Sequence, residues 1–268
     1  MSIKMIAIDI DGTLLNSQHQ LTDKVKHTLQ QKSAEGVKIV LATGRPTIGT
    51  HHVVQQLGFN TDDNFIISYN GSLVSSAGSK KTYVKHGLTY DDFLEIEVLS
   101  RAIGVHLHFQ DQQTMYTCNR DISPYTVHEA FLTRIPLVYR TVEEITPEID
   151  IIKAMFIDHQ DVLDAAAKKI PAAFKEKFTT VKSAPFFLEV LNPLASKGNA
   201  VRELAGKLNI QPSEIMSLGD NENDLSMIEF AGIGVAMGNG LDSVKEIADK
   251  ITLSNDEDGV AYAIDKWA

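Results

Sequence analysis

The sequence is poor in cysteine and contains no long hydrophobic segment. Its 268 residues include one cysteine, Cys118, so no intramolecular disulfide can form and a reducing compartment is expected. Nowhere do about 18 apolar residues follow one another, so no transmembrane helix is predicted. The apolar N-terminal run meets Asp9 and Asp11 before it reaches the length of a secretory signal. We therefore expect a cytoplasmic protein.

Positive charge is also scarce in this sequence. Lysine and arginine number 25 against 35 aspartate and glutamate residues, which gives a formal net charge of −10. Basic side chains supply most of the non-specific affinity for a nucleic acid backbone or an anionic lipid surface. We therefore expect neither a nucleic acid nor a membrane as a partner. The hydrophobic fraction of 43% is ordinary for a globular protein and suffices for a sizeable core.

The first third of the sequence alternates short apolar runs with helical patterns. Buried strands are expected at residues 5–10, 37–42 and 65–68, and amphipathic helices at 25–34 and 48–57. Strands that alternate with helices are typical of a parallel sheet with right-handed crossovers. After the third strand, Asn70-Gly71 predicts a tight hairpin with residues 72–74 as the return strand.

The same pattern returns near the C-terminus, whereas the middle of the chain differs. Strands are expected at 215–218, 232–235 and 251–253, between helices at 197–208, 221–230, 241–248 and 259–267. The middle favours strands at 105–110, 113–118, 153–158, 178–183 and 186–191, with helices at 89–103, 123–132 and 161–170. This pattern predicts a parallel α/β core, residues 1–84 and 191–268, interrupted by an α+β domain at 85–190.

Candidate functional side chains stand at the ends of the expected strands. Two carboxylates, Asp9 and Asp11, close the first strand, and Gly12 permits a sharp turn there. Paired carboxylates repel each other unless a cation or a shared proton lies between them, and hard oxygen ligands suit Mg²⁺. Thr43 follows the second strand and offers a hydroxyl and N–H groups that can hold a phosphate oxygen.

Two further groups come from the C-terminal half. Ser196 can cap the helix at 197–208, while Lys197 opposes the helix dipole there and suits a phosphoryl group. An acidic run from Gly219 to Asp224 follows the strand at 215–218. Taken singly, each of these groups also fits an ordinary cap, turn or surface residue. The carboxyl ends of parallel strands meet at one crevice, however, and independent caps do not predict that convergence.

The whole set fits phosphoryl transfer. This reaction needs an in-line nucleophile, neutralisation of the negative charge on the equatorial oxygens and a proton donor for the leaving group. An aspartate carboxylate can be the nucleophile and form an aspartyl-phosphate. Mg²⁺ and Lys197 would supply the positive charge. Because a net charge of −10 does not attract an anionic substrate, these local cations must outweigh the global field.

Together these residues resemble the four motifs of the haloacid dehalogenase (HAD) superfamily of phosphatases, in the order Asp9-Ile10-Asp11-Gly12-Thr13, Thr43, Lys197 and Gly219-Asp220-Asn221-Glu222-Asn223-Asp224. The inserted domain, preceded by Asn70-Gly71, resembles the large α/β cap (C2-type) of the Cof-type branch. The length and the motif positions are close to those of the YidA-type sugar phosphatases. The resemblance covers the whole chain and implies a Rossmann-like, HAD-like core with a substrate-selecting α+β cap.

The resemblance also implies an activity and a role for each motif residue. The activity would be Mg²⁺-dependent hydrolysis of small phosphorylated metabolites, sugar phosphates foremost. Asp9 would be the nucleophile, and Asp11 the general acid and then the base for the hydrolytic water. Mg²⁺ would be held by Asp9, the backbone carbonyl of Asp11, Asp220 and, through water, Asp224. The phosphoryl group would be bound by the N–H groups of Ile10 and Gly12 and by Thr43, Gly44, Lys197 and Asn223, the last of which could instead orient Lys197.

Some polar residues keep two interpretations. One face of the strand expected at 105–110 either touches the leaving group or is a solvated sheet face, and the solvated face is favoured: His106, His108 and Gln110. Arg45 either contacts the substrate or caps the helix at 48–57. Cys118 has no base beside it in the sequence and is expected to be unreactive.

Other functions stay open at this point. A phosphosugar mutase would use the same aspartyl-phosphate with a bisphosphate activator, and product analysis separates it from a phosphatase. A non-enzymatic phospho-acceptor switch also combines an acidic Mg²⁺ pocket, a hydroxyl and a lysine, but its acceptor lies on a middle strand of a single domain. A binding module with a degenerate site is the third alternative, and the intact carboxylates and lysine argue against it.

Overall fold

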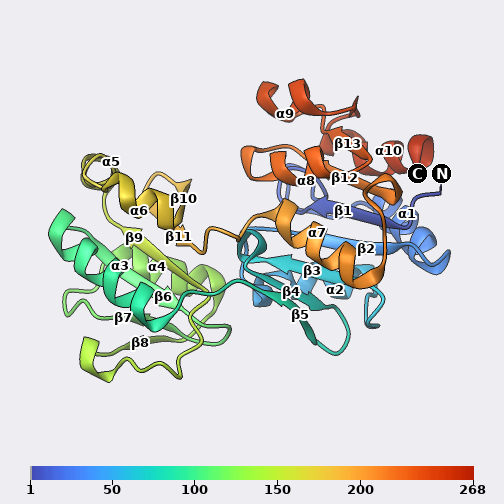
Figure 1. The fold of residues 1–268 in the computed structure, drawn as a ribbon. Coiled ribbons are helices and arrows are strands. Elements are labelled where there is room, and N and C mark those ends of the chain that lie inside the picture. Colours follow the sequence, from blue (N-terminus) through green and yellow to red (C-terminus); the bar gives the residue numbers. More distant parts are fainter. Residues whose placement is uncertain (1) are drawn as a thin grey trace. The chain divides into compact units, whose positions relative to one another are not determined.

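The computed structural model describes residues 2–268, which form two compact units (Figure 1). The core unit consists of the described residues up to Lys85 together with Ser196–Ala268, and the insert unit consists of His86–Ala195. The sequence places the return to the core after residue 190. In the structure Asn192 still belongs to the insert unit, because its side-chain amide donates to the backbone oxygen of Gly87 over 2.9 Å.

The core unit is built on an eight-stranded sheet of order β14-β13-β12-β1-β2-β3-β4-β5. The strands from β14 through β3 run parallel, and β4 and β5 add an antiparallel edge. The strands are β1 (Met5–Asp9), β2 (Lys38–Ala42), β3 (Phe65–Ser68), β4 (Leu73–Ser76), β5 (Thr82–Lys85), β12 (Ile215–Gly219), β13 (Ile233–Ala236) and β14 (Lys250–Ile251). The central position of β1 brings its end next to the ends of β2 and β12.

Helices cover both faces of the core sheet and bury an apolar layer on each. One layer is closed by α1, α2 and α10, and the other by α7, α8 and α9. The helices are α1 (Asp23–Ala34), α2 (His51–Leu57), α7 (Lys197–Leu208), α8 (Leu225–Phe230), α9 (Asp242–Ile247) and α10 (Gly259–Trp267). Every residue of β1 is buried, as expected for a strand between two helical layers.

The helix ends follow local capping rules. Ser196 is the N-cap of α7 and accepts a hydrogen bond from the backbone N–H of Asn199 over 3.1 Å, which confirms the predicted cap. At the other end of α7, Asn209 has the left-handed conformation typical of a helix C-terminus. Two helices expected from the sequence begin with a 3-10 turn, namely η1 (Thr47–Thr50) before α2 and η5 (Glu222–Asp224) before α8.

The insert unit contains a six-stranded sheet of order β10-β11-β9-β6-β7-β8. All its neighbouring strands are antiparallel except β7 and β8. The strands are β6 (His106–Gln110), β7 (Met115–Thr117), β8 (Leu137–Tyr139), β9 (Lys153–Ile157), β10 (Thr179–Ala184) and β11 (Phe187–Leu191). The predicted fold class, a parallel α/β core with an α+β insert, is confirmed.

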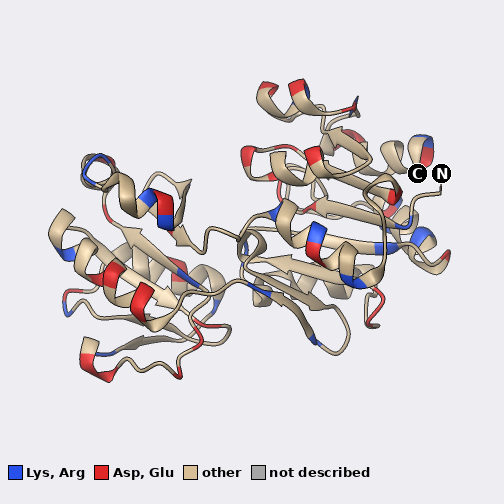
Figure 2. Cartoon of the chain, in the orientation of Figure 1, with Lys and Arg blue, Asp and Glu red and all other residues tan. Residues whose placement is uncertain are grey.

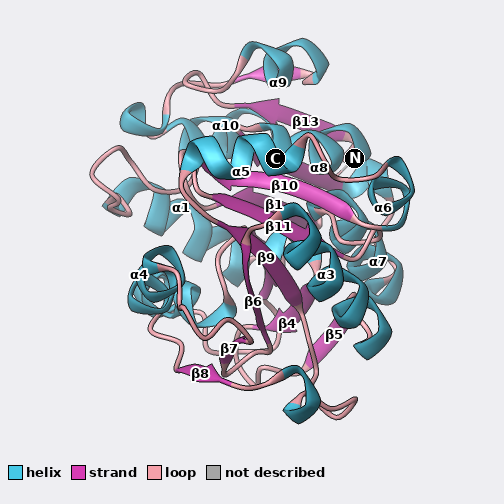
Figure 3. Cartoon of the chain, turned by 90° about the vertical axis from the view of Figure 1, so that its left-hand side faces the viewer, coloured by secondary structure: helices cyan, strands magenta, loops and turns pink. Residues whose placement is uncertain are grey.

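Helices lie on both sides of the insert sheet. An apolar cluster joins one face to α3, α5 and α6, and α4 lies against the other face, so β6 and β9 stand between α3 and α4 (Figure 3). The helices are α3 (Tyr90–Ile103), α4 (Pro124–Thr133), α5 (Gln160–Ala167) and α6 (Ala172–Lys177). The strands β5 and β8 and the helix α6 are not expected from the sequence, because the two strands bury few residues and α6 has one buried residue, Phe174.

The turn after β3 differs from the predicted two-residue hairpin. β3 and β4 do pair antiparallel, but Tyr69–Ser72 connect them, and the return strand is Leu73–Ser76. The turn contains the 3-10 segment η2 (Tyr69–Gly71), in which three successive residues have positive φ angles of 51°, 54° and 102°. A hairpin of the predicted type has a two-residue loop, whereas four residues lie here between the paired residues Ser68 and Leu73.

The polar face of β6 is buried, and the prediction of a solvated face is wrong for two of its three residues. His108 and Gln110 are fully buried, whereas His106 is partly exposed and pairs with Asp158 over 2.9 Å. The reason is α4, which lies over this face and places Thr126 Oγ1 3.4 Å from His108 Nδ1. Periodicity alone indicates a polar face but does not show which helix covers it.

Charged residues lie mostly on the helices, turns and loops of both units, and the strands are mostly uncharged (Figure 2). A buried exception is the ion pair of Lys153 on β9 with Glu189 on β11, at 3.4 Å. Throughout residues 2–268, no helix has both the length and the apolar character needed to cross a membrane.

His108 should make the stability of the protein sensitive to acid. Burial, aided by the positive charge of Lys153, lowers the pKa of His108 from 6.5 to about 3. Between those pH values the unfolded chain binds a proton that the folded chain does not, so stability falls as the pH falls from 6.5. We expect His108→Gln to reduce the slope of unfolding free energy against pH by up to about 1.4 kcal/mol per pH unit.

Urea unfolding at several pH values between 6.5 and 4 measures this slope. The same replacement at the exposed His52 is the matched control and should leave the slope unchanged. Equal slopes in wild type and His108→Gln would show that the buried His108 does not cause the loss of stability in acid.

Candidate active site

Three carboxylates meet at the carboxyl ends of β1 and β12. Asp9 is the last residue of β1, and Asp220 and Asp224 follow the neighbouring parallel strand β12. One oxygen atom from each lies within 4.8 Å of the other two. Thr13 Oγ1 donates a hydrogen bond to Asp220 Oδ1 over 2.8 Å, which orients that carboxylate. The convergence expected at this edge of the sheet is therefore present.

Lys197 lies in the middle of this group. It is the first residue of α7 and is 1% exposed. Its Nζ donates to Asp9 Oδ1 over 2.5 Å and to Asp224 Oδ1 over 2.6 Å. Burial lowers the pKa of Lys197, but the two carboxylates raise it by more, so its pKa lies above the usual value and the ammonium stays charged. The carboxylates offset the helix dipole that disfavours a cation at this position.

One lysine leaves the carboxylate group with an excess of negative charge. Burial raises the pKa of Asp9 well above its usual value; Lys197 opposes this rise and Asp224 adds to it. Burial likewise raises the pKa of Asp220, although the hydrogen bond from Thr13 lowers it. The three carboxylates repel one another when all are ionised, and a further cation would relieve this repulsion. Their hard oxygen atoms are the ligands that Mg²⁺ prefers. The residues present therefore fit a magnesium ion.

Asp224 is held by the backbone as well as by Lys197. Its Oδ2 accepts hydrogen bonds from the backbone N–H groups of Asp220 and Asn221, over 2.9 and 3.0 Å. A Cβ atom on Gly219 would lie 2.4 Å from the Asp224 Cβ, so the end of β12 approaches this side chain closely. Asp224 is completely buried and has both oxygen atoms engaged.

Asp11 lies apart from the three clustered carboxylates. Its side chain is paired with Arg45, which donates to it from Nε over 2.8 Å and also from Nη2. Arg45 further donates from Nη1 to the backbone oxygen of Gly49 in η1, and its backbone N–H donates to Thr43 Oγ1. In this structure the main contact of the Arg45 side chain is therefore Asp11.

Several predicted phosphate ligands surround the same edge of the sheet. Thr43 is buried directly after β2, and Asn223 lies in η5. Asn223 Nδ2 donates to Asn70 Oδ1 over 3.0 Å, and the backbone N–H of Asn70 donates to the backbone oxygen of Thr43. The sequence did not indicate the contact between Asn70 and Asn223, because Asn-Gly predicts a turn but does not show what the turn contacts.

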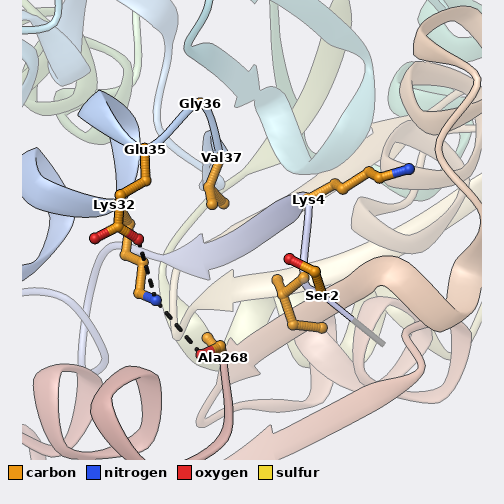
Figure 4. A pocket seen from close by; sticks show the side chains of 8 residues that line it. Ser2, Lys4, Lys32, Glu35, Gly36, Val37 and Ala268 are labelled. Carbon is orange, nitrogen blue, oxygen red and sulfur yellow. Dashed lines mark hydrogen bonds and ion pairs between the residues drawn. The ribbon is translucent and has the colours of Figure 1, made fainter.

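Cys118 and a small pocket lie outside this group. Burial, with Glu97 nearby, raises the pKa of Cys118 to about 12, so the thiol is unreactive as expected. A pocket of about 260 Å³ lies at the opposite edge of the core sheet, where Lys4 and Val37 precede β1 and β2 (Figure 4). Lys32 reaches the Ala268 backbone oxygen there and pairs with Glu35.

The family model for haloacid dehalogenase-like hydrolases matches residues 6–264, so the chain belongs to that family. A Streptococcus pyogenes (serotype M6) protein is 49% identical over 267 residues, which cover 100% of this chain and 99% of the relative. Phosphatase YwpJ of Bacillus subtilis is 32% identical over 285 residues, which cover 97% of this chain and 98% of the relative. The family model and relatives that are named phosphatases show that the chain is an enzyme of the phosphatase type.

Solved structures show the same architecture. A haloacid dehalogenase-like hydrolase from Bacteroides thetaiotaomicron superposes with a TM-score of 0.87 at 32% identity, with 99% of each chain covered. The HAD subclass IIB sugar phosphatase BT4131 superposes with a TM-score of 0.77 at 26% identity, with 98% of each chain covered. The expected HAD fold and the Cof-type family resemblance are therefore confirmed.

The glycine that follows Asp11 should be required for metal binding. Gly12 has φ +85°, and a Cβ atom on it would lie 2.5 Å from Asp220 Oδ2. Gly36 has φ +92° and nothing near its Cβ position, so Gly36→Ala pays the same backbone strain of roughly 1–2 kcal/mol without a collision. We expect Gly12→Ala to lose Mg²⁺ affinity and Gly36→Ala to keep it, as measured by calorimetric titration. Equal affinities for Mg²⁺ would show that Asp220 does not hold the ion.

Lys197 should stabilise the metal-free protein. Lys197→Met leaves Asp9 and Asp224 buried without their cation, which costs about 3–5 kcal/mol when one partner of a buried pair is removed. Urea unfolding without divalent ions should show this loss, and added Mg²⁺ should recover part of it by binding the folded state. Lys207→Met, at an exposed position of the same helix, is the control. The account fails if both variants are equally stable.

Proposed function

We propose that the protein hydrolyses small phosphorylated metabolites, sugar phosphates foremost, with Mg²⁺ as its cofactor and an aspartyl-phosphate on Asp9 as the intermediate. One observation carries this proposal: the buried Asp9 carboxylate meets Asp220 and Asp224 at the end of the central strand, and Lys197 Nζ pairs with both Asp9 and Asp224. The sugar phosphatase BT4131, whose fold this chain shares at 26% identity, supports the choice of substrate class.

The metal would be held by the carboxylates of Asp9 and Asp220, with Asp224 beside them, and by the backbone carbonyl of Asp11. When bound, Mg²⁺ supplies positive charge to the phosphoryl oxygens. Lys197 adds a second positive charge beside Asp9, since its Nζ lies between Asp9 and Asp224. Charge neutralisation of this kind is the main contribution of proteins to phosphoryl transfer.

In the first step the Asp9 carboxylate attacks phosphorus. The new bond joins an Asp9 oxygen to phosphorus, and the bond from phosphorus to the leaving-group oxygen breaks. Asp11 donates a proton to that oxygen, so the leaving group departs as a neutral alcohol. Ile10 and Gly12 would donate backbone N–H groups to the phosphoryl oxygens.

In the second step a water molecule attacks the phosphorus of the aspartyl-phosphate. Asp11 accepts the proton of the water, the bond from phosphorus to Asp9 breaks, and inorganic phosphate leaves. The proton left on Asp11 returns it to the form needed for the next first step.

The remaining phosphate ligands would be side chains from separate loops. Thr43 with Gly44, Lys197 and Asn223 would hold the phosphoryl oxygens. The insert unit would act as the cap that selects the leaving group, because a domain inserted between the motifs is free to vary without disturbing the carboxylates. A single cysteine and a net charge of −10 favour a cytoplasmic location and a small-molecule partner over a nucleic acid or a membrane.

The first test is release of phosphate from an aryl phosphate with and without Mg²⁺. We expect turnover that needs Mg²⁺ and falls at least about a thousandfold in Asp9→Asn, because the amide is not a nucleophile. Asp265→Asn, at an exposed position of α10, should keep full activity. The products are also examined for phosphate transferred to a sugar acceptor. Such transfer would indicate a mutase.

Other outcomes exclude the proposal. A stable phosphoryl adduct on Asp9 without turnover would favour a phospho-acceptor or a mutase. Turnover that survives in Asp9→Asn would remove Asp9 from the chemistry. If aryl phosphate is turned over, a panel of sugar phosphates then tests the substrate class.

A further inference from the structure

The turn η2 contacts three of the four segments that carry the active-site residues. The backbone N–H of Tyr69 donates to the backbone oxygen of Arg45, and the backbone N–H of Asn70 donates to the backbone oxygen of Thr43, each over 3.0 Å. The Asn70 side chain accepts from Asn223 Nδ2 over 3.0 Å. A single short turn, distant in sequence from the recognised motifs, therefore joins the segments after β2 and β12.

The third contact is with the start of α7. A Cβ atom on Gly71 would lie 2.2 Å from the backbone oxygen of Ser196, the N-cap that precedes Lys197. A contact this close between two backbones is possible only at a glycine. The turn therefore packs directly against the residue that sets the position of the lysine.

The backbone of this turn is strained. Tyr69 has φ 51°, in the left-handed region that bulky side chains rarely adopt, and such a residue costs of order 1–3 kcal/mol. Asn70 follows with φ 54° and Gly71 with φ 102°. Strain of this kind persists where surrounding contacts determine the conformation, and it is concentrated at functional sites. The backbone hydrogen bonds to Thr43 and Arg45 are such contacts.

The Asn70 side chain is placed where it can act on the phosphate ligands. It is 7% exposed, and a Cβ atom on Gly44 would lie 3.1 Å from its amide atoms. The side-chain amide therefore lies between the Thr43–Gly44 segment and Asn223. An asparagine amide nitrogen carries two hydrogens, and the bond to Asn70 Oδ1 uses one of those of Asn223.

We propose that Asn70 is a positioning residue of the phosphatase reaction: it fixes the side-chain amide of Asn223 so that its second hydrogen is donated to the substrate's phosphoryl group. This inference rests on the proposed function. Without Asn70 the Asn223 amide can rotate about its side-chain bonds, and its alignment has to be recovered each time phosphate binds. The effect should appear with every phosphate ester, because it concerns the phosphoryl group and not the leaving group.

Asn70→Gly removes the side chain and keeps a residue that adopts positive φ readily. The chain offers a close control in Asn209, which has φ 55° against 54° for Asn70 but lies exposed at the far end of α7. With an aryl phosphate and Mg²⁺, we expect Asn70→Gly to lower kcat/KM about tenfold and to raise the inhibition constant of inorganic phosphate. Asn209→Gly should change neither quantity.

A double-mutant cycle with Asn223→Ala identifies the route of the effect. If Asn70 acts through Asn223, the double variant should lose no more activity than Asn223→Ala alone. Losses that multiply would show that the two residues act independently and would overturn the proposal. An Asn70→Gly variant with a lower Tm but an unchanged kcat/KM and phosphate inhibition would also overturn it, since the role would then be only structural.

A measurement without turnover separates this inference from the proposed function. The side-chain amide signal of Asn223 in a ¹⁵N spectrum, assigned by its loss in Asn223→Ala, should shift on addition of inorganic phosphate and Mg²⁺. In Asn70→Gly we expect the unbound signal to move toward that of a solvated amide. An unchanged signal would contradict the positioning role even if the enzyme is active, whereas absent wild-type turnover would contradict only the proposed reaction.

Discussion

The buried contact of Lys197 with Asp9 and Asp224 determines much of the core unit. Lys197 and Asp9 are 188 residues apart in the chain, yet their charged atoms lie 2.5 Å apart without solvent. Removing either partner would leave a buried charge uncompensated, which is among the costliest defects in a protein interior. The N-terminus of α7 must therefore lie at the ends of β1 and β12. Gly71 approaches Ser196 and Gly219 approaches Asp224 closely at the same place.

The same contact explains why the site is suited to a phosphate ester and a divalent cation. Three carboxylates against one ammonium leave a net negative charge that burial makes unfavourable, as the raised pKa values of Asp9 and Asp220 indicate. In the proposed function a cation would relieve this repulsion and, together with Lys197, would attract the phosphoryl group. An overall acidic protein can thus bind an anion, because the local arrangement of charges differs from the global one.

The insert unit shows a second use of buried polar groups. Lys153 and Glu189 pair within it over 3.4 Å, and His108 stays neutral beside them. These groups lie on the sheet face covered by α4, opposite the apolar cluster that holds α3, α5 and α6. The face under α4 therefore mixes these polar groups with a small apolar cluster of Met155, Ile157 and Phe187, whereas the opposite face is lined by the larger apolar cluster. We expect the stability of this unit to depend on pH because His108 is buried on the mixed face.

The sequence by itself determined the alternation of buried strands and helices, the Ser196 cap, the α+β insert and the carboxylates at strand ends, because periodicity, capping and strand-end position are local properties of the chain. It did not reveal that α4 buries His108 and Gln110, that Arg45 pairs with Asp11, or that Asn70 supports Asn223. Only the tertiary structure decided these, since each is a contact between segments whose pairing no local pattern records. The Asn70-Gly71 pair is an example: its residue types predict a turn, but only the folded chain shows which segments that turn contacts.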